Sequence, residues 1–193
     1  SNENGGTLFA SLLSSVYVLL HKYSAQEDIC IGVPVANRAH QQVENLIGFF
    51  VNTVVNRIQL RPDISLETLF NEVQKELIVG QENQEVPFDK VVEALQPKRE
   101  TSITPIFQVM VHYLQMSDGF SLGDTEVTIE ESSYGRVKFD LNFDFVETKN
   151  DGLFISFGYS NDLFSEQTAE RLLNNLITII NTFASNSDQL LSN

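Results

Sequence analysis

The chain has 193 residues, the length of one ordinary domain, and 42% of them are hydrophobic, which is enough to form a core. Its 12 basic and 26 acidic residues give a net charge of −14. This excess of acid argues against nucleic acid or an anionic membrane as a partner, because phosphate groups are bound by clustered Lys and Arg. No apolar run reaches the roughly 20 residues of a membrane span, and no basic-then-apolar leader is visible, so we expect a cytoplasmic protein.

The first third of the chain predicts one helix and two apolar segments. In residues 7–23, apolar side chains recur every three or four positions on more than one face, as in a broadly buried helix. Residues 28–35 (DICIGVPV) form a short run rich in β-branched residues, which is typical of a buried strand. A polar stretch follows, and then a second apolar segment covers residues 49–60.

Two further helices are predicted in the middle of the chain. Residues 65–79 place their apolar side chains on one face, with Ser65 as the expected N-cap and Gly80 as the expected stop. A short helix is predicted over residues 87–95, because proline is tolerated in the first turn.

The second half predicts mostly strands and a closing helix. Residues 106–114 alternate with period two, and residues 138–146 and 153–159 do the same on either side of a TKNDG turn, which predicts an antiparallel hairpin. Residues 165–184 have a helical period. The mixture predicts the α+β class, with a mixed, largely antiparallel sheet and helices packed on it.

The residues that most often carry metal or covalent chemistry are few. Cys30 lies between two isoleucines, and one thiol cannot form an internal disulfide, so we expect a buried structural cysteine in a reducing compartment. Three histidines and one cysteine, widely separated, exclude the usual zinc clusters. His112 stands six residues before Asp118, but the spacing does not match the acyl-transfer signature His-His-x-x-x-Asp-Gly.

Other catalytic signatures are missing as well. The sequence contains no Gly-x-Ser-x-Gly elbow and no phosphate-binding Gly-x-x-x-x-Gly-Lys loop. The acidic cluster in residues 124–131 is expected to be a solvated face. From residue chemistry alone, the sequence therefore indicates an α+β domain without a self-contained active site.

Three segments, taken in order, resemble a known family. They are residues 47–57 (IGFFVNTVVNR), 83–89 (NQEVPFD) and 99–108 (RETSITPIFQ), and they resemble the later core motifs of condensation domains from nonribosomal peptide synthetases. Three further sequence segments show the same resemblance: residues 28–38 (DICIGVPVANR), 138–141 (KFDL) and 159–164 (YSNDLF).

The resemblance covers only the back half of the family's domain. Condensation domains have two lobes, each similar to chloramphenicol acetyltransferase, and the catalytic His-His-x-x-x-Asp-Gly segment belongs to the front lobe. The resemblance therefore implies that residues 1–193 are a single C-terminal lobe that is inactive alone. Two departures are Glu85, where the family more often has Asp, and residues 103–104 (Ile-Thr), where it often has Arg-Asn.

The function that the resemblance implies is amide bond formation. An upstream carrier protein presents an aminoacyl or peptidyl thioester on its phosphopantetheine arm, and a downstream carrier presents the attacking amine. The implied partners are the front lobe, both carrier proteins and an adjacent adenylation domain, and no cofactor is expected to bind this lobe directly. The lobe would supply the tunnel wall, a floor segment and a latch.

On this resemblance, Asn52 and Thr53 are candidates for polar groups that face the tunnel at the junction of the lobes. Arg38 and Arg57 are candidates for structural ion pairs or contacts to the tunnel floor. Alternatives remain open: Asn52 could satisfy backbone groups at a strand edge, and Arg57 could form a surface salt bridge.

Five further residues belong to the family's motifs and are expected to be structural. For Pro87 and Phe88, the favoured interpretation is a helix start with a core anchor. The complete structural set is Gly48, Pro87, Phe88, Pro105 and Asp140.

Residues 115–135, rich in Gly, Ser and Asp, are the expected latch, with a mobile surface loop as the alternative.

Three alternative functions compete with this one. The chain could be a lobe of the related epimerization or heterocyclization domains, or a non-catalytic module that docks carrier proteins. A free-standing acetyltransferase would need its own His-x-x-x-Asp and is disfavoured. A lobe cut from a larger domain would expose apolar surface, so weak self-association is expected.

Overall fold

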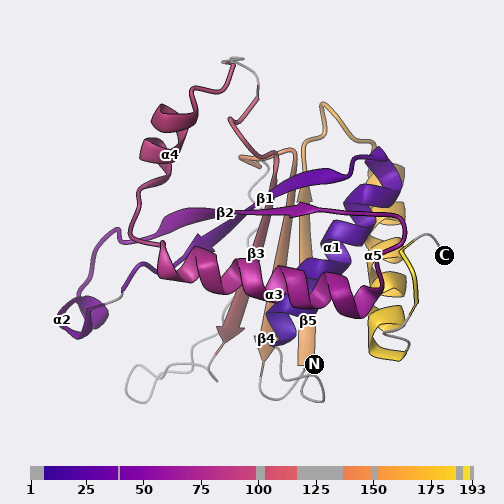
Figure 1. Cartoon of the computed structure of the whole chain (residues 1–193), viewed down its shortest axis with the longest axis horizontal. Coiled ribbons are helices and arrows are strands. Elements are labelled where there is room, and N and C mark those ends of the chain that lie inside the picture. The colour runs from indigo at the N-terminus through magenta and orange to yellow at the C-terminus, as the bar shows by residue number, and fades with distance from the viewer. Residues whose placement is uncertain are drawn as a thin grey trace, which may run out of the picture.

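The computed structural model describes residues 7–38, 40–98, 103–116, 137–148, 152–185 and 189–191. In these residues the strands form one sheet in the order β2-β1-β3-β4-β5 (Figure 1). The strands are β1 (Asp28–Val35), β2 (Asn52–Gln59), β3 (Val109–Met116), β4 (Leu141–Thr148) and β5 (Gly152–Tyr159). The helices are α1 (Leu8–Ser24), α2 (Gln41–Glu44), α3 (Leu66–Glu82), α4 (Phe88–Leu95) and α5 (Glu166–Ser185).

The sheet is mixed. β1 and β2 pair antiparallel along their whole lengths, as do β4 and β5, which confirms the predicted hairpin. β3 and β4 pair in parallel along their whole lengths, whereas β1 and β3 pair in parallel at only two positions. The α+β class and the mixed sheet are thus confirmed. Figure 1 shows β1 and β2 running across the direction of β3, β4 and β5.

Helix α1 is the centre of the core. All of residues 12–19 are buried, as the sequence predicted, because α1 contacts both α3 and α5 and also packs on β1. Helix α3 in turn packs on β2. The buried side chains of β4, Leu141, Phe143 and Phe145, belong to the same apolar cluster.

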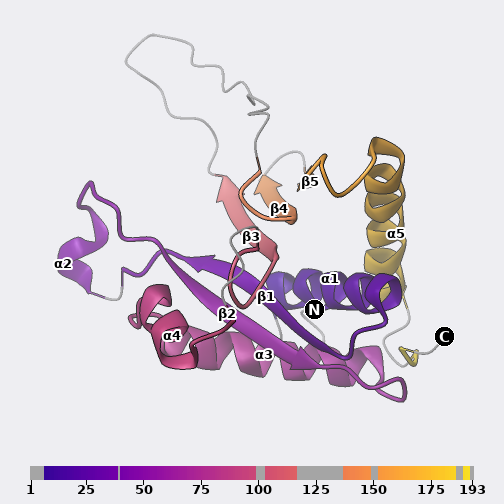
Figure 2. The ribbon, with the colours of Figure 1, turned by 90° about the horizontal axis from the view of Figure 1, so that it is seen from above.

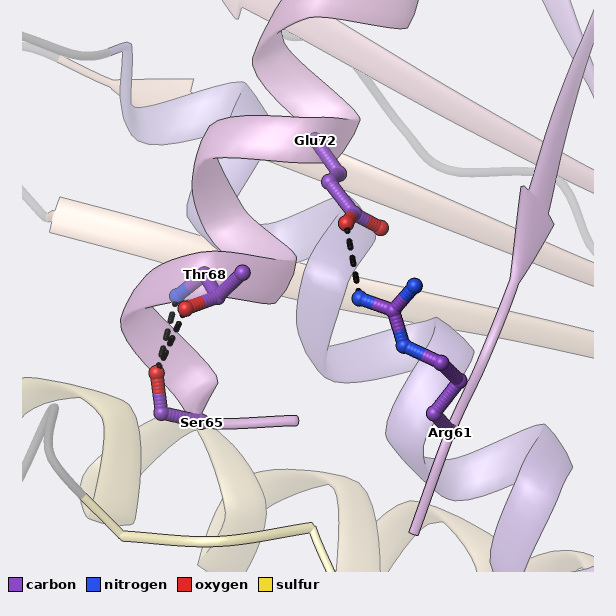
Figure 3. A network of polar contacts seen from close by, with 4 residues as sticks. All are labelled: Arg61, Ser65, Thr68 and Glu72. Atoms are coloured by element: carbon purple, nitrogen blue, oxygen red, sulfur yellow. Dashed lines mark hydrogen bonds and ion pairs between the residues drawn. The ribbon is translucent and has the colours of Figure 1, made fainter. Parts of the chain in front are cut away.

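Helix α3 begins as predicted but ends later. The Ser65 hydroxyl accepts a hydrogen bond from the Thr68 N–H at 3.1 Å, and Arg61 Nη2 lies 3.4 Å from Glu72 Oε1, so both contacts hold the first turns of the helix (Figure 3). The predicted stop at Gly80 is wrong, because α3 continues to Glu82.

Gly80 has a different role from the one expected. A Cβ at this position would lie 2.7 Å from Val54 Cγ1 on β2. The missing side chain therefore lets α3 approach the sheet closely, which is a packing function of glycine and not a capping one. No helix in the described part of the chain combines the length and the low charge needed to cross a membrane.

Candidate functional site

A cleft opens where the sheet divides. β1 and β3 are paired only through Ile31 with Val109 and Gly32 with Met110, and beyond these positions the two strands diverge. A cavity of about 750 Å³ occupies the resulting wedge. Its walls are the start of α1, the end of β1, β2, the second half of α3 and the ends of β3 and β4. We call this cavity the wedge cleft.

Two buried polar residues meet beside the cleft. Tyr17 on α1 is fully buried, and its hydroxyl lies 2.7 Å from the Asn56 carbonyl oxygen and 2.8 Å from Asn56 Oδ1. Burial raises the pKa of Tyr17 well above its usual value, so the hydroxyl stays protonated and can donate. Asn56 on β2 and Gln74 on α3 both line the wedge cleft.

The mouth of the cleft carries an acidic hydrogen-bonded group. The Tyr113 hydroxyl donates a hydrogen bond to the Glu147 carboxylate, and Gln115 Nε2 donates to the same carboxylate at 3.0 Å. These two bonds, that of Tyr113 first, lower the pKa of Glu147. Burial, and then the bond to Glu147, raises the pKa of Tyr113. Glu147 therefore remains an anion, and its Oε2 accepts both bonds.

The described residues between β1 and β2, 36–38 and 40–51, form a loop that includes the short helix α2 and projects from the body of the molecule (Figures 1 and 2). Arg38 organises it: its guanidinium donates to the carbonyls of Val43 and Glu44 and lies 4.4 Å from the centre of the Phe50 ring. Gly48 is exposed, and a Cβ there would come within 2.8 Å of the same ring. The contacts of Arg38 in the described residues are thus to carbonyls and a ring and not an ion pair.

The tip of this loop is apolar and uncovered. Ile47 and Phe49 are essentially fully exposed, and Leu46 and Val51 are about half exposed. We call residues 46–51 the projecting segment. Such a contiguous exposed apolar run is typical of a surface that another protein surface covers.

Asn52, a predicted tunnel residue, acts as a clamp. Its Nδ2 donates to the carbonyl oxygens of Gln84 at 2.8 Å and Val86 at 2.7 Å, and its Oδ1 accepts from the Phe88 N–H at 3.1 Å. These bonds tie β2 to the connection between α3 and α4. They match the alternative role of an amide that satisfies backbone groups at the start of a strand.

Thr53 and Arg57 lie on the same strand but outside the cleft lining. Thr53 is half-buried opposite Pro34 in the β1–β2 ladder. Arg57 is exposed and forms a bidentate pair with Asp28, through Nε at 2.8 Å and Nη2 at 2.6 Å. This pair lowers the pKa of Asp28, chiefly through the hydrogen bond. The geometry is that of a surface salt bridge, which is the alternative role that the sequence analysis gave for Arg57.

The prediction that Cys30 is buried is wrong. The thiol is half-buried and not buried as predicted, because β1 is bordered here by a smaller hollow of about 380 Å³ that Asp28, Arg57 and Ile106 also line. Burial raises the pKa of the Cys30 thiol, so the thiolate is disfavoured.

The motif residues around α4 and β3 build an aromatic cluster. Pro87 is the N-cap of α4, and the half-buried Phe88 packs edge-on against Phe107 with ring centres 5.4 Å apart, in line with a helix start and core anchor. Phe107 also contacts the ring of Phe139 at 5.3 Å. A Cβ on Gly32 would lie 2.3 Å from the Phe107 ring, so the ring needs glycine beneath it.

A strained turn at residues 105–107 positions the Phe107 ring in this cluster. The Phe107 N–H donates to the Pro105 carbonyl at 3.0 Å, and Ile106 between them has φ of 74°, which together define a classical γ-turn. Asp140 contributes its backbone: its N–H donates to Gln108 O and its carbonyl accepts from Ser160 N–H, each at 3.0 Å.

Groups able to perform covalent or metal chemistry are sparse around the cleft. His112 Nδ1 lies 3.7 Å from Asp144 Oδ1, and neither residue lines the cleft. The described ranges contain no cluster of three or more His, Cys, Asp or Glu that could hold a metal ion. Asp118, the acidic residues 124–131 and most of the expected latch, residues 115–135, lie outside the described residues.

Sequence reasoning missed the cleft and its polar residues. Asn56 and Gln74 lie close to a divergence of strands that no sequence pattern marks. The one available signal was the asparagine itself, since residue 56 shares the face of its strand with the apolar Val54 and Ile58.

Comparisons with known proteins agree with this architecture. The family model "Condensation domain" matches residues 1–193. The chain is 40% identical over 190 residues to malpibaldin synthetase of Mortierella alpina and 35% identical over 193 residues to gramicidin S synthase 2 of Brevibacillus brevis. These matches cover 98% and 97% of this chain but only 3% and 4% of the two relatives.

Solved structures show the same fold. A four-domain nonribosomal peptide synthetase matches with a TM-score of 0.87 at 25% identity, over all of this chain and 16% of the other. The X-domain from teicoplanin biosynthesis matches with a TM-score of 0.89 at 24% identity, over 99% of this chain and 44% of the other. With the family model matching its whole length, the chain belongs to the condensation domain family.

Proposed function

We propose that the chain is the C-terminal lobe of a condensation domain that joins a carrier-bound thioester donor to a carrier-bound amine acceptor. The observation that carries the proposal is the match of the condensation model to residues 1–193, together with identities of 35% and 40% to peptide synthetases. In the reaction, the amine nitrogen attacks the thioester carbonyl, the C–N bond forms, the C–S bond breaks, and the amine proton leaves with the released thiol.

Two observations support a lobe and not a whole domain. The chain covers only 44% of the condensation domain from a polyketide synthase and 44% of the teicoplanin X-domain, while nearly all of its own length is matched. The projecting segment also exposes Ile47 and Phe49 beside the cleft-forming strands. A front lobe seated against this segment would cover that apolar surface and close the wedge cleft into a tunnel.

The chemistry of the cleft supports a binding role for this lobe. The one carboxylate in its described lining, Glu147, already accepts hydrogen bonds from Tyr113 and Gln115, so we assign the general base to the front lobe, whose histidine would position or deprotonate the amine. In this proposal the lobe contributes a tunnel wall, which holds the phosphopantetheine arms of the donor and acceptor carriers in line. Such positioning can supply about 7–11 kcal/mol of the barrier reduction.

The partners follow from this role. The front lobe, the donor and acceptor carrier proteins with their phosphopantetheine arms, and an adenylation domain would surround this lobe in the assembly line. A cytoplasmic location, where acyl-carrier substrates are made, is part of the same proposal.

A split-domain reconstitution tests the function. The front lobe is added to this chain with both carriers loaded, and the dipeptidyl thioester is sought by intact-protein mass spectrometry. We expect product only when both lobes are present, and none when the front-lobe histidine is replaced by alanine. A stable complex of the two lobes that yields no product would overturn the catalytic proposal.

A second function, docking without chemistry, has one observation in its favour. The X-domain of teicoplanin biosynthesis, solved as a complex with OxyB, shares this fold with a TM-score of 0.86 at 23% identity. Titration of this chain alone with loaded carrier proteins separates the two functions. Tight binding without the front lobe, with no product in the reconstitution, would favour docking.

A further inference from the structure

Two buried polar atoms beside the wedge cleft have no hydrogen-bond partner among the described residues. Asn56 is only 2% exposed, and its Nδ2 is closed off from solvent and unpaired. Gln74 Oε1 is likewise closed off and unpaired. A buried polar group without a partner costs about 1–3 kcal/mol, so two of them on residues that line one cavity call for a physical explanation.

The two atoms are chemically complementary. Asn56 Nδ2 is a donor on β2 and Gln74 Oε1 is an acceptor on α3, two elements that pack against each other. The Tyr17 hydroxyl lies against Asn56 Oδ1, which fixes the amide with its donor side free. A ligand that satisfies both atoms must therefore present one acceptor and one donor.

The rest of the lining narrows the ligand class. The cleft is walled mainly by apolar side chains, among them Phe9, Val33 and Leu77, and Glu147 is the one charged residue in its described lining. That carboxylate is already bonded by Tyr113 and Gln115. A neutral ligand with apolar flanks fits these walls, whereas a phosphate group would find no cation in the lining that the structure describes.

We propose that Asn56 and Gln74 form an amide-binding pair that grips one secondary amide of a substrate arm lying in the wedge cleft. The amide carbonyl accepts from Asn56 Nδ2, and the amide N–H donates to Gln74 Oε1. Both atoms are closed off from solvent in this structure, so the ligand reaches them only if the half-buried Gln74 side chain, which has three rotatable bonds, turns toward the cleft and uncovers Asn56. The inference rests on the proposed function for the arm's identity, which is either pantetheine or a peptidyl chain.

Side-chain amide NMR on the ¹⁵N-labelled chain tests the pair. The probes are pantetheine and N-acetyl-alanine methylamide, which separate the two sources of the amide. We expect at least one probe to shift the Asn56 side-chain signals, and Gln74→Met to weaken its binding by about fivefold or more, the loss of one hydrogen bond. Gln74→Glu keeps an acceptor and should restore part of the affinity.

The matched control is Gln167→Met, the same change at an exposed position of α5 outside the cleft. Equal affinities of the Gln74→Met and Gln167→Met variants would overturn the proposal, as would binding that leaves the Asn56 signals unmoved, or no binding of either probe. Probe binding that depends on Gln74, in a domain that forms no product on reconstitution, would retain the pair and refute only the catalytic function.

Discussion

Replacement of Asn52 by alanine is expected to destabilise the fold more than its half-buried position suggests. The side chain makes three hydrogen bonds to backbone, with Gln84 O at 2.8 Å, Val86 O at 2.7 Å and Phe88 N at 3.1 Å. Each such bond contributes about 1 kcal/mol net, and the alanine cannot replace any of them. We therefore expect the free energy of unfolding to fall by about 2–4 kcal/mol.

Urea unfolding followed by circular dichroism measures this loss, and hydrogen exchange at the Phe88 amide locates it. The matched control is Asn71→Ala, the same change at an exposed position of α3, for which we expect a change within about 0.5 kcal/mol, since alanine is the better helix former. Equal losses for the two variants, or unchanged protection of the Phe88 amide in the Asn52 variant, would refute the clamp.

Three further predictions concern a buried hydroxyl, a surface ion pair and the projecting segment. Tyr17→Phe removes the donor from two buried acceptors and should cost about 1–3 kcal/mol in urea unfolding, whereas Tyr23→Phe, at a more exposed hydroxyl, should cost less; equal costs would contradict the burial argument. Because Arg57 lowers the pKa of Asp28, the carboxylate stabilises the fold above about pH 4, and the effect is lost as the pH falls through the folded pKa. Asp28→Asn should thus lower the thermal midpoint at pH 7 and match the wild type in strong acid, and a difference that persists there would exclude the pair as its cause. Phe49→Ser should reduce weak self-association in sedimentation velocity, a prediction that a strictly monomeric wild type would contradict.

Local patterns predicted most of the elements because their causes are local. The β-branched run of residues 28–35 is β1 with the same bounds, and Ser65 caps α3 through its own hydroxyl. Gly80 shows the limit of such reasoning. A glycine near a helix end suggests a stop, but here it faces Val54 on another element, and that contact depends on tertiary packing.

The functional site depends on causes that no local pattern carries. The wedge cleft exists because β1 and β3 part after two residue pairs, which depends on strand order and twist across segments about 80 residues apart. The family motifs led to Asn52 and Arg57, whose side chains bond to the backbone and to Asp28. Asn56, which the motifs did not single out, has a donor beside the cleft that is unpaired within the part of the chain that the structure describes.

The central claim is that the wedge cleft forms one side of the tunnel in which the amide bond is made. Filling the wedge cleft tests this claim most directly. Gln81 is exposed and lines the cleft, whereas its neighbour Glu82 is exposed and does not. In the reconstituted two-lobed domain with both carriers loaded, we expect Gln81→Trp to slow formation of the dipeptidyl thioester by about tenfold or more, and Glu82→Trp to leave the rate near that of the wild type. Equal rates for the two variants, with both lobes folded and associated, would contradict the account.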